Sequence, residues 1–110
     1  MTGQETFSWD ELDDDLWSIQ ERFERFHTHH PEVAEQLVLL TRRAMLAGRN
    51  KVGMGMLFEV LRWERLLAGL PDETETYKLN NDYRSRYARM IMATHPELDG
   101  IYETRRLKTL

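Results

Sequence analysis

The stretch "MGMLFEVLRWERLLAG", residues 54–69, decides the fold because apolar side chains occur on nearly every side of the helix it predicts. A helix that is apolar all round is normally buried among other elements. We therefore expect residues 54–69 to form the central helix of the domain, with Trp63 in the core. Gly69 and Pro71 follow, and a glycine with a proline close behind it is typical of a helix end.

Further helices are predicted on both sides of this stretch from apolar residues that recur at intervals of three and four. Pro31 suits the first position of a helix, Gly48 suits a C-cap, and Asn80 or Asn81 suits an N-cap. The expected ranges are 9–28, 31–48 and 82–94, with a short last helix at 96–104. The fold class is therefore mainly α, a compact domain of four to five helices.

The bulk composition predicts one ordinary globular domain. The chain has 110 residues, 41% of them hydrophobic and 31% charged, which is within the range of water-soluble domains. We expect a flexible acidic amino terminus at 1–8, a single helical domain at 9–104 and a basic carboxyl-terminal tail at 105–110. No apolar run approaches the roughly 20 residues that cross a bilayer, so no membrane partner is expected. The absence of cysteine suits the cytoplasm.

Charge is distributed unevenly along the chain. Residues 1–24 carry eight acidic residues and one arginine, a balance of −7, whereas residues 25–110 carry 14 Lys/Arg and 11 Asp/Glu, a balance of +3. Such asymmetry indicates either an anionic partner for the basic part or an acidic segment that covers it.

The order of the predicted elements also fits a winged helix-turn-helix domain with two very short strands. Val52 and the pair Ile101 and Tyr102 are the segments that we expect to pair as strands. One feature differs, because the loop from Gly69 to Asn80 is longer than the three or four residues of a usual helix-turn-helix turn.

The predicted helix 82–94 is the candidate for nucleic-acid recognition. Its tyrosines, Tyr83 and Tyr87, share the inward side, so its outer side is basic and rich in hydrogen-bond donors. Helix starts and arginines of this kind suit phosphates and the acceptor edge of guanine. The residues expected to bind DNA are Lys78, Asn81, Arg84, Ser85, Arg86, Arg89, Arg105 and Arg106.

The alternative is a protein-interaction adaptor or inhibitor that uses the predicted helix 9–28. This helix is acidic and aromatic. The pI near 5.5 is more compatible with a protein-interaction domain than with a DNA-binding protein. Its contact residues would be Trp9, Asp13, Leu16 and Trp17. The partner would then be another protein, and the oligomeric state stays open.

The chain offers little to catalysis or metal binding. In "HTHH", His27 and His30 are spaced so that both could bind one metal ion. Histidines near a helix end equally interact with its last carbonyl groups. No glycine-rich phosphate loop, nucleophile motif or paired carboxylates are recognisable. We predict no enzyme activity, no metal and no cofactor.

Three runs carry a resemblance to a known group of proteins. They are "FERFHTHHPEV", "KVGMGMLFEVLRWE" and "YKLNNDYRSRYARMIMATHPELDGIYETRRLK", within residues 22–108. The chain resembles a family of small uncharacterised proteins encoded by bacteriophages and prophages. The resemblance implies action inside a bacterial host cell and implies no particular activity.

Overall fold

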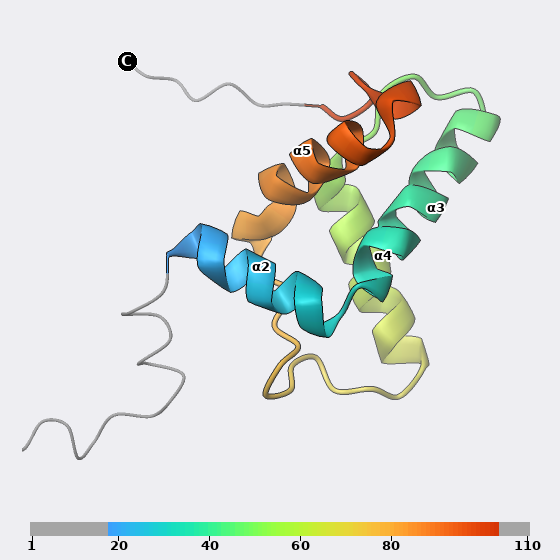
Figure 1. The fold of residues 1–110 in the computed structure, drawn as a ribbon. Coiled ribbons are helices and arrows are strands. Elements are labelled where there is room, and N and C mark those ends of the chain that lie inside the picture. The colour runs from blue at the N-terminus through green and yellow to red at the C-terminus, as the bar shows by residue number, and fades with distance from the viewer. Residues whose placement is uncertain (1–17, 104–110) are drawn as a thin grey trace, which may run out of the picture.

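The computed structural model describes residues 18–103, which form four α-helices and two short 3-10 helices (Figure 1). The α-helices are α2 (Ile19–His29), α3 (Glu32–Leu46), α4 (Met54–Leu67) and α5 (Arg84–Thr94), and the 3-10 helices are η2 (Asn81–Tyr83) and η3 (Pro96–Leu98). The prediction of a compact, mainly helical domain is confirmed. The predicted segments 1–8 and 105–110 lie outside the described residues.

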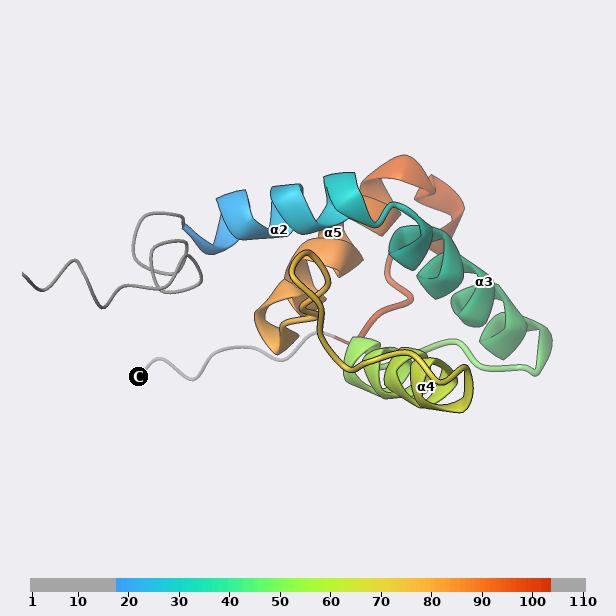
Figure 2. The same ribbon diagram turned by 90° about the horizontal axis from the view of Figure 1, so that it is seen from below.

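Helix α5 occupies the centre of the domain. It contacts α3, α4, η2 and η3, and its side chains Tyr87 and Ile91 are almost completely buried. Figure 2 shows α5 between α2 on one side and α4 on the other. The prediction that residues 54–69 form the central helix is therefore wrong, because α4 lies at the edge of the domain and buries only one of its faces.

An aromatic cluster joins α2 to α5. The Phe23 ring meets the Tyr87 ring edge-on at a centroid distance of 4.8 Å, and the Phe26 ring lies 5.5 Å from the ring of Tyr83. Such pairs add about 0.5–1.5 kcal/mol each beyond the apolar area they bury. Tyr83 and Tyr87 are both buried, so the prediction that these tyrosines face the core is confirmed.

Helix ends follow local sequence signals at most positions. Gly48 and Gly69 adopt the left-handed conformation after α3 and α4, with φ of 96° and 74°. Ser18 caps α2, since its hydroxyl accepts from the Glu21 amide and the Glu21 carboxylate accepts from the Ser18 amide. This helix therefore begins at Ile19, whereas one continuous helix from about residue 9 was predicted; residues 9–17 lie outside the described part of the chain.

The last predicted helix, 96–104, is also wrong, because residues 96–103 form only the single turn of η3. Gly100 follows it with φ of 84°, and the chain then extends through Ile101. None of the helices within residues 18–103 combines the length and the apolar character needed to cross a membrane.

One β-bridge links the two segments that were predicted to pair. Val52 and Tyr102 form an isolated parallel bridge, in which the Val52 amide donates to the Ile101 carbonyl at 2.9 Å and the Glu103 amide donates to the Val52 carbonyl at 3.0 Å. Residues 18–103 contain no further pairing of this kind and no sheet. The bridge ties the chain after α5 to the start of α4.

The buried hydroxyls of Tyr87 and Tyr102 differ in their partners. The Tyr102 hydroxyl lies 2.8 Å from Thr41 Oγ1, and the Thr41 hydroxyl donates to the Leu37 carbonyl at 2.7 Å. The Tyr87 hydroxyl is buried, and nothing in the described part of the chain bonds to it. Burial raises the pKa of both phenols, most strongly that of Tyr87.

This difference predicts opposite effects of the same substitution. Tyr87→Phe removes an unsatisfied buried hydroxyl and should raise the free energy of unfolding by about 1 kcal/mol, whereas Tyr102→Phe breaks a buried hydrogen bond and should lower it by a similar amount. Urea unfolding followed by circular dichroism measures both. A loss of stability in Tyr87→Phe would contradict the packing described here.

The same variant has a pH signature. A phenol whose pKa is raised in the folded state stabilises the fold fully below the unfolded value near 10, and this contribution is lost as the pH rises toward the folded value. Stability of the natural chain should therefore fall above about pH 10, and the fall should be shallower in Tyr87→Phe.

Candidate functional site

The exposed side of α5 holds only part of the predicted nucleic-acid-binding set. Arg84, Ser85 and Arg89 are exposed, as predicted. Asn81 and Arg86 are engaged within the domain, since Arg62 Nη2 donates to Asn81 Oδ1 at 2.8 Å and Arg86 Nε donates to Gln20 Oε1 at 2.9 Å. The structure therefore brings together a smaller basic surface than the sequence indicates.

A capped 3-10 turn precedes α5. The Asp82 amide donates to the Asn80 side chain at 2.7 Å, so the predicted asparagine cap serves η2, and Tyr83, the N-cap residue of α5, makes no side-chain cap bond. Arg84 Nε donates to the Asn81 carbonyl at 2.9 Å. The Asp82 carboxylate lies in the turn just before α5, so it places negative charge next to the helix start where an anion was predicted to bind.

Of the remaining predicted residues only Lys78 belongs to the part of the chain that the structure describes. Lys78 is half-buried and lines a hollow of about 310 Å³ together with Arg22, Arg25 and His29, opposite Glu73 and Glu75. Charges of both signs therefore meet there. The others, Arg105, Arg106, Trp9, Asp13, Leu16 and Trp17, lie outside the described residues.

A second hollow is lined by residues of both α2 and α5. It measures about 450 Å³, and Glu24, His27, Arg86 and Arg89 are among its lining residues. His27 Nδ1 is buried, with no partner among the described residues. Glu24 offsets the arginines, so this hollow too carries mixed charge.

The histidines of "HTHH" are held in separate surroundings. The His27 ring meets the Tyr87 ring edge-on at 6.2 Å, whereas His30 Nε2 bonds to Thr76 Oγ1 at 2.9 Å and His30 Nδ1 lies 3.3 Å from Glu32 Oε2. Within residues 18–103 no three His, Cys, Asp or Glu side chains are grouped so that they could hold a metal ion.

A row of exposed apolar side chains follows the outer face of α4 and continues just past its end, which sequence reasoning missed. We call it the outer stripe: Met56, Val60, Trp63, Leu67 and Leu70. Four of its members are well exposed, Met56 at 68%, Trp63 at 57%, Leu67 at 66% and Leu70 at 50%, and Val60 is half-buried. The prediction that Trp63 is a core residue is wrong.

The outer stripe lies opposite the side of α4 that faces the core. Met54, Leu57, Phe58 and Leu61 are buried against the rest of the domain, and the stripe residues lie about half a turn away around the helix. Figure 2 shows α4 along one edge of the molecule, with α3 and α5 on its inner side. The helix is apolar on nearly all sides, as predicted, but only one side is covered.

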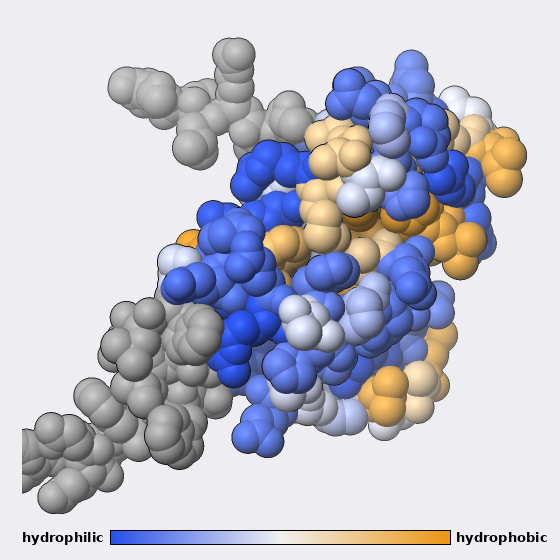
Figure 3. All heavy atoms as spheres, viewed as in Figure 1, coloured by the Kyte–Doolittle hydropathy of each residue, from blue (hydrophilic) through white to orange (hydrophobic). Residues whose placement is uncertain are grey.

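The end of the outer stripe is fixed by the helix C-terminus. The Leu70 amide donates to the Arg65 carbonyl and the Gly69 amide to the Leu66 carbonyl, both at 3.0 Å, which is the Schellman arrangement. Leu70 is thereby held next to the last turn of α4. Figure 3 shows exposed hydrophobic side chains, in orange, at the carboxyl-terminal ends of both α4, at the lower right, and α3, at the upper right.

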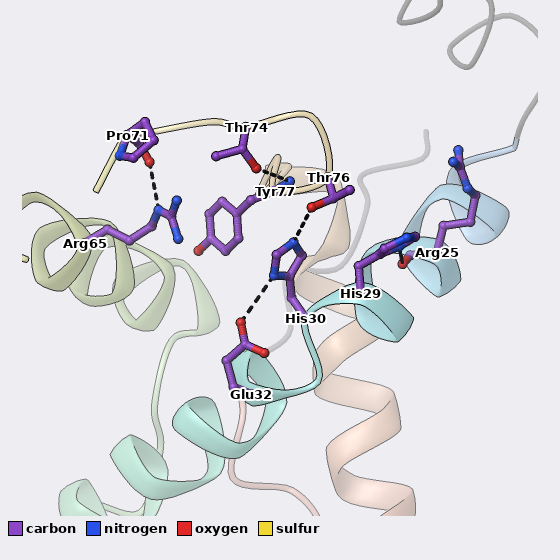
Figure 4. A network of polar contacts seen from close by, with 9 residues as sticks. All are labelled: Arg25, His29, His30, Glu32, Arg65, Pro71, Thr74, Thr76 and Tyr77. Atoms are coloured by element: carbon purple, nitrogen blue, oxygen red, sulfur yellow. Dashed lines mark hydrogen bonds and ion pairs between the residues drawn. The ribbon is translucent and has the colours of Figure 1, made fainter. Parts of the chain in front are cut away.

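A polar network holds the long loop that follows α4 (Figure 4). Arg65 lies over the Tyr77 ring, with its guanidinium carbon 3.7 Å from the ring centroid, and its Nε donates to the Pro71 carbonyl at 2.9 Å. From the other side, His30 bonds to Thr76. Tyr77 is buried, and its pKa is raised by burial against the opposing effect of Arg65. The loop is therefore tied to both α2 and α4.

Comparison with known proteins adds no relative. No family model, no curated protein and no solved structure matches the chain. The resemblance to phage-encoded proteins therefore stays a prediction.

The two faces of α4 should respond differently to substitution. Phe58→Ala removes a fully buried ring and should lower the free energy of unfolding by about 3–5 kcal/mol. Trp63→Gln changes an exposed position and should cost about 1 kcal/mol or less. Urea unfolding of both variants makes the comparison. A cost at Trp63 that equals the cost at Phe58 would contradict the exposed position of Trp63.

Proposed function

We propose that this protein is a non-enzymatic interaction domain, which binds a helix of another protein along the outer stripe of α4. The observation that carries the proposal is the exposure of Met56, Trp63 and Leu67 on the side of α4 opposite the core. Exposed apolar patches that exceed a few hundred Å² are unusual on monomeric proteins and typically mark interaction sites. Tryptophan is also enriched among residues that dominate binding energy.

Burial of the outer stripe supplies a driving force for association. Covering one large apolar side chain stabilises a complex by roughly 1.5–3 kcal/mol, and the stripe offers several such side chains in one row. The α4 backbone is held in place by the core face, so binding does not require α4 to fold first. Such preorganisation limits the entropy lost on association.

The setting that we propose is the bacterial cytoplasm, with a host or phage protein as the partner. It rests on the resemblance of residues 22–108 to phage-encoded proteins and on a sequence without cysteine. This function replaces the predicted contact helix 9–28 by α4 as the surface that meets the partner.

The experiment compares two double variants of the full chain. Met56→Gln with Trp63→Gln alters the outer stripe, and Leu39→Gln with Leu46→Gln removes equally exposed side chains from α3 as the control. Each chain is used for affinity capture from bacterial lysate, and any protein lost only with the stripe variant is purified and titrated. Its affinity for the stripe variant should fall at least tenfold, roughly the effect of losing a central tryptophan.

Two results would contradict the proposal. In one, both double variants retain the same partners as the natural chain. In the other, the purified partner binds the stripe variant and the natural chain with equal affinity.

Nucleic-acid binding through α5 is a second candidate, favoured by one observation. Arg84, Ser85 and Arg89 remain exposed on α5. The bridge between Val52 and Tyr102 and the order of the helices support the winged helix-turn-helix form of this proposal. The long, anchored loop between α4 and α5 and the Asp82 carboxylate just before α5 oppose it.

Salt dependence tests the second candidate. If α5 binds DNA, titration of a random-sequence duplex should give an affinity that weakens steeply with salt, because phosphate contacts release counterions. Arg84→Ala with Arg89→Ala should lower it about tenfold at low salt, while the control Arg43→Ala with Arg49→Ala removes the same charge from α3 and the turn after it. The absence of binding at low salt, or equal losses in both variants, would exclude α5 as the DNA surface.

A further inference from the structure

We infer that the helix accepted by the outer stripe is amphipathic and carries lysine or arginine on both sides of its apolar seam. This inference rests on the proposed function and adds the chemistry of the partner. Two independent observations support it, the spacing of the stripe residues and the charges that flank them.

The spacing of the stripe fits a partner helix better than a loop or a strand. Within α4, Met56, Val60, Trp63 and Leu67 follow one another at intervals of four, three and four residues, and Leu70 lies just past the helix end, after Gly69. This alternation is the seam of a coiled coil, in which each side chain inserts between residues of a facing helix at a crossing angle of about +20°. From Met56 to Leu67 the seam is about 16 Å long, at 1.5 Å per residue, which matches roughly three turns of a partner.

Each flank of the seam carries one acidic residue. Glu59 borders the outer stripe on one side, where Leu66 is also exposed, and Glu64 borders it on the other; both glutamates are exposed. In a coiled coil these are the positions whose charges select the partner. Glu59 also pairs with Arg62 at 2.7 Å, but its side chain remains 71% exposed and keeps further acceptor sites.

The two arginines of α4 leave carboxylate oxygens available along the stripe. Arg62 Nη1 pairs with Glu59 at 2.7 Å, while its Nη2 donates to the Leu79 carbonyl and to Asn81. Arg65 stacks on Tyr77 and is turned toward the loop. Glu64 is exposed and the Glu59 side chain is 71% exposed, so both still present carboxylate oxygens to a partner.

These charges disfavour a second copy of the chain as the occupant. If two α4 helices paired through their stripes, Glu59 and Glu64 of one copy would border those of the other, and like charges at these positions oppose pairing. The same carboxylates oppose a nucleic acid. A basic amphipathic helix satisfies both the apolar seam and the flanking charges.

The test uses two designed helical peptides of about three heptads, identical except for their flanking charge. Both carry leucine at the seam positions, one has lysine at every flanking position and the other has glutamate. Like charges keep each peptide from pairing with itself. The full chain, labelled with ¹⁵N, is titrated with each peptide, and amide shifts of α4 are followed together with the affinity from calorimetry.

The lysine peptide should shift α4 resonances and bind at least about tenfold more tightly than the glutamate peptide at low salt, with a smaller difference at high salt. The variant Glu59→Lys with Glu64→Lys should invert this preference. Glu32→Lys with Glu35→Lys, which makes the same charge change in the first turn of α3, serves as the control and should leave the preference unchanged.

Each adverse result points to a different failure. If both peptides bind α4 equally and the Glu59 and Glu64 variant keeps that equality, the charge inference is overturned while the proposed function stands. If neither peptide shifts α4 resonances, the outer stripe does not accept a helix and the proposed function fails with the inference. Dimerisation of the free chain through α4 in sedimentation measurements would identify a second copy as the occupant and overturn the inference.

Discussion

Packing around the Tyr87 ring is the interaction on which the rest of this fold depends. The ring is fully buried, meets Phe23 of α2 at 4.8 Å and meets Phe58 of α4 at 6.1 Å. It therefore joins the first and third described helices through the fourth. In a domain of this size few residues pack against two other helices at once. Such a residue therefore contributes disproportionately to the cooperativity of folding.

The central place of α5 explains why the apolar surface of α4 is exposed. One helix contributes only a limited area to a core, and α5 and the segments joined to it already cover the side of α4 that carries Met54, Phe58 and Leu61. The opposite side then lies at the edge of the domain. Loop residues after α4 could have folded back over it, but Arg65 and His30 hold the loop at Tyr77, toward α2.

The basic surface of α5 is reduced by the same packing. Sequence reasoning placed Tyr83 and Tyr87 in the core and left the arginines outside, which is right for Arg84 and Arg89. Arg86 is different because Gln20, far away in the sequence, lies within hydrogen-bond distance of it. A pattern within one helix contains no information about a side chain that arrives from another element.

The sequence by itself determined the helical class and most helix ends. These depend on local chemistry: glycine tolerates the left-handed conformation at Gly48 and Gly69, and Asn80 caps a helix start. The sequence also contained the four-three spacing of the outer stripe. Periodicity shows that a helix face is apolar, but it does not show which element covers that face. Only the tertiary structure decided which apolar face of α4 is buried, because that choice depends on contacts between elements distant in the chain.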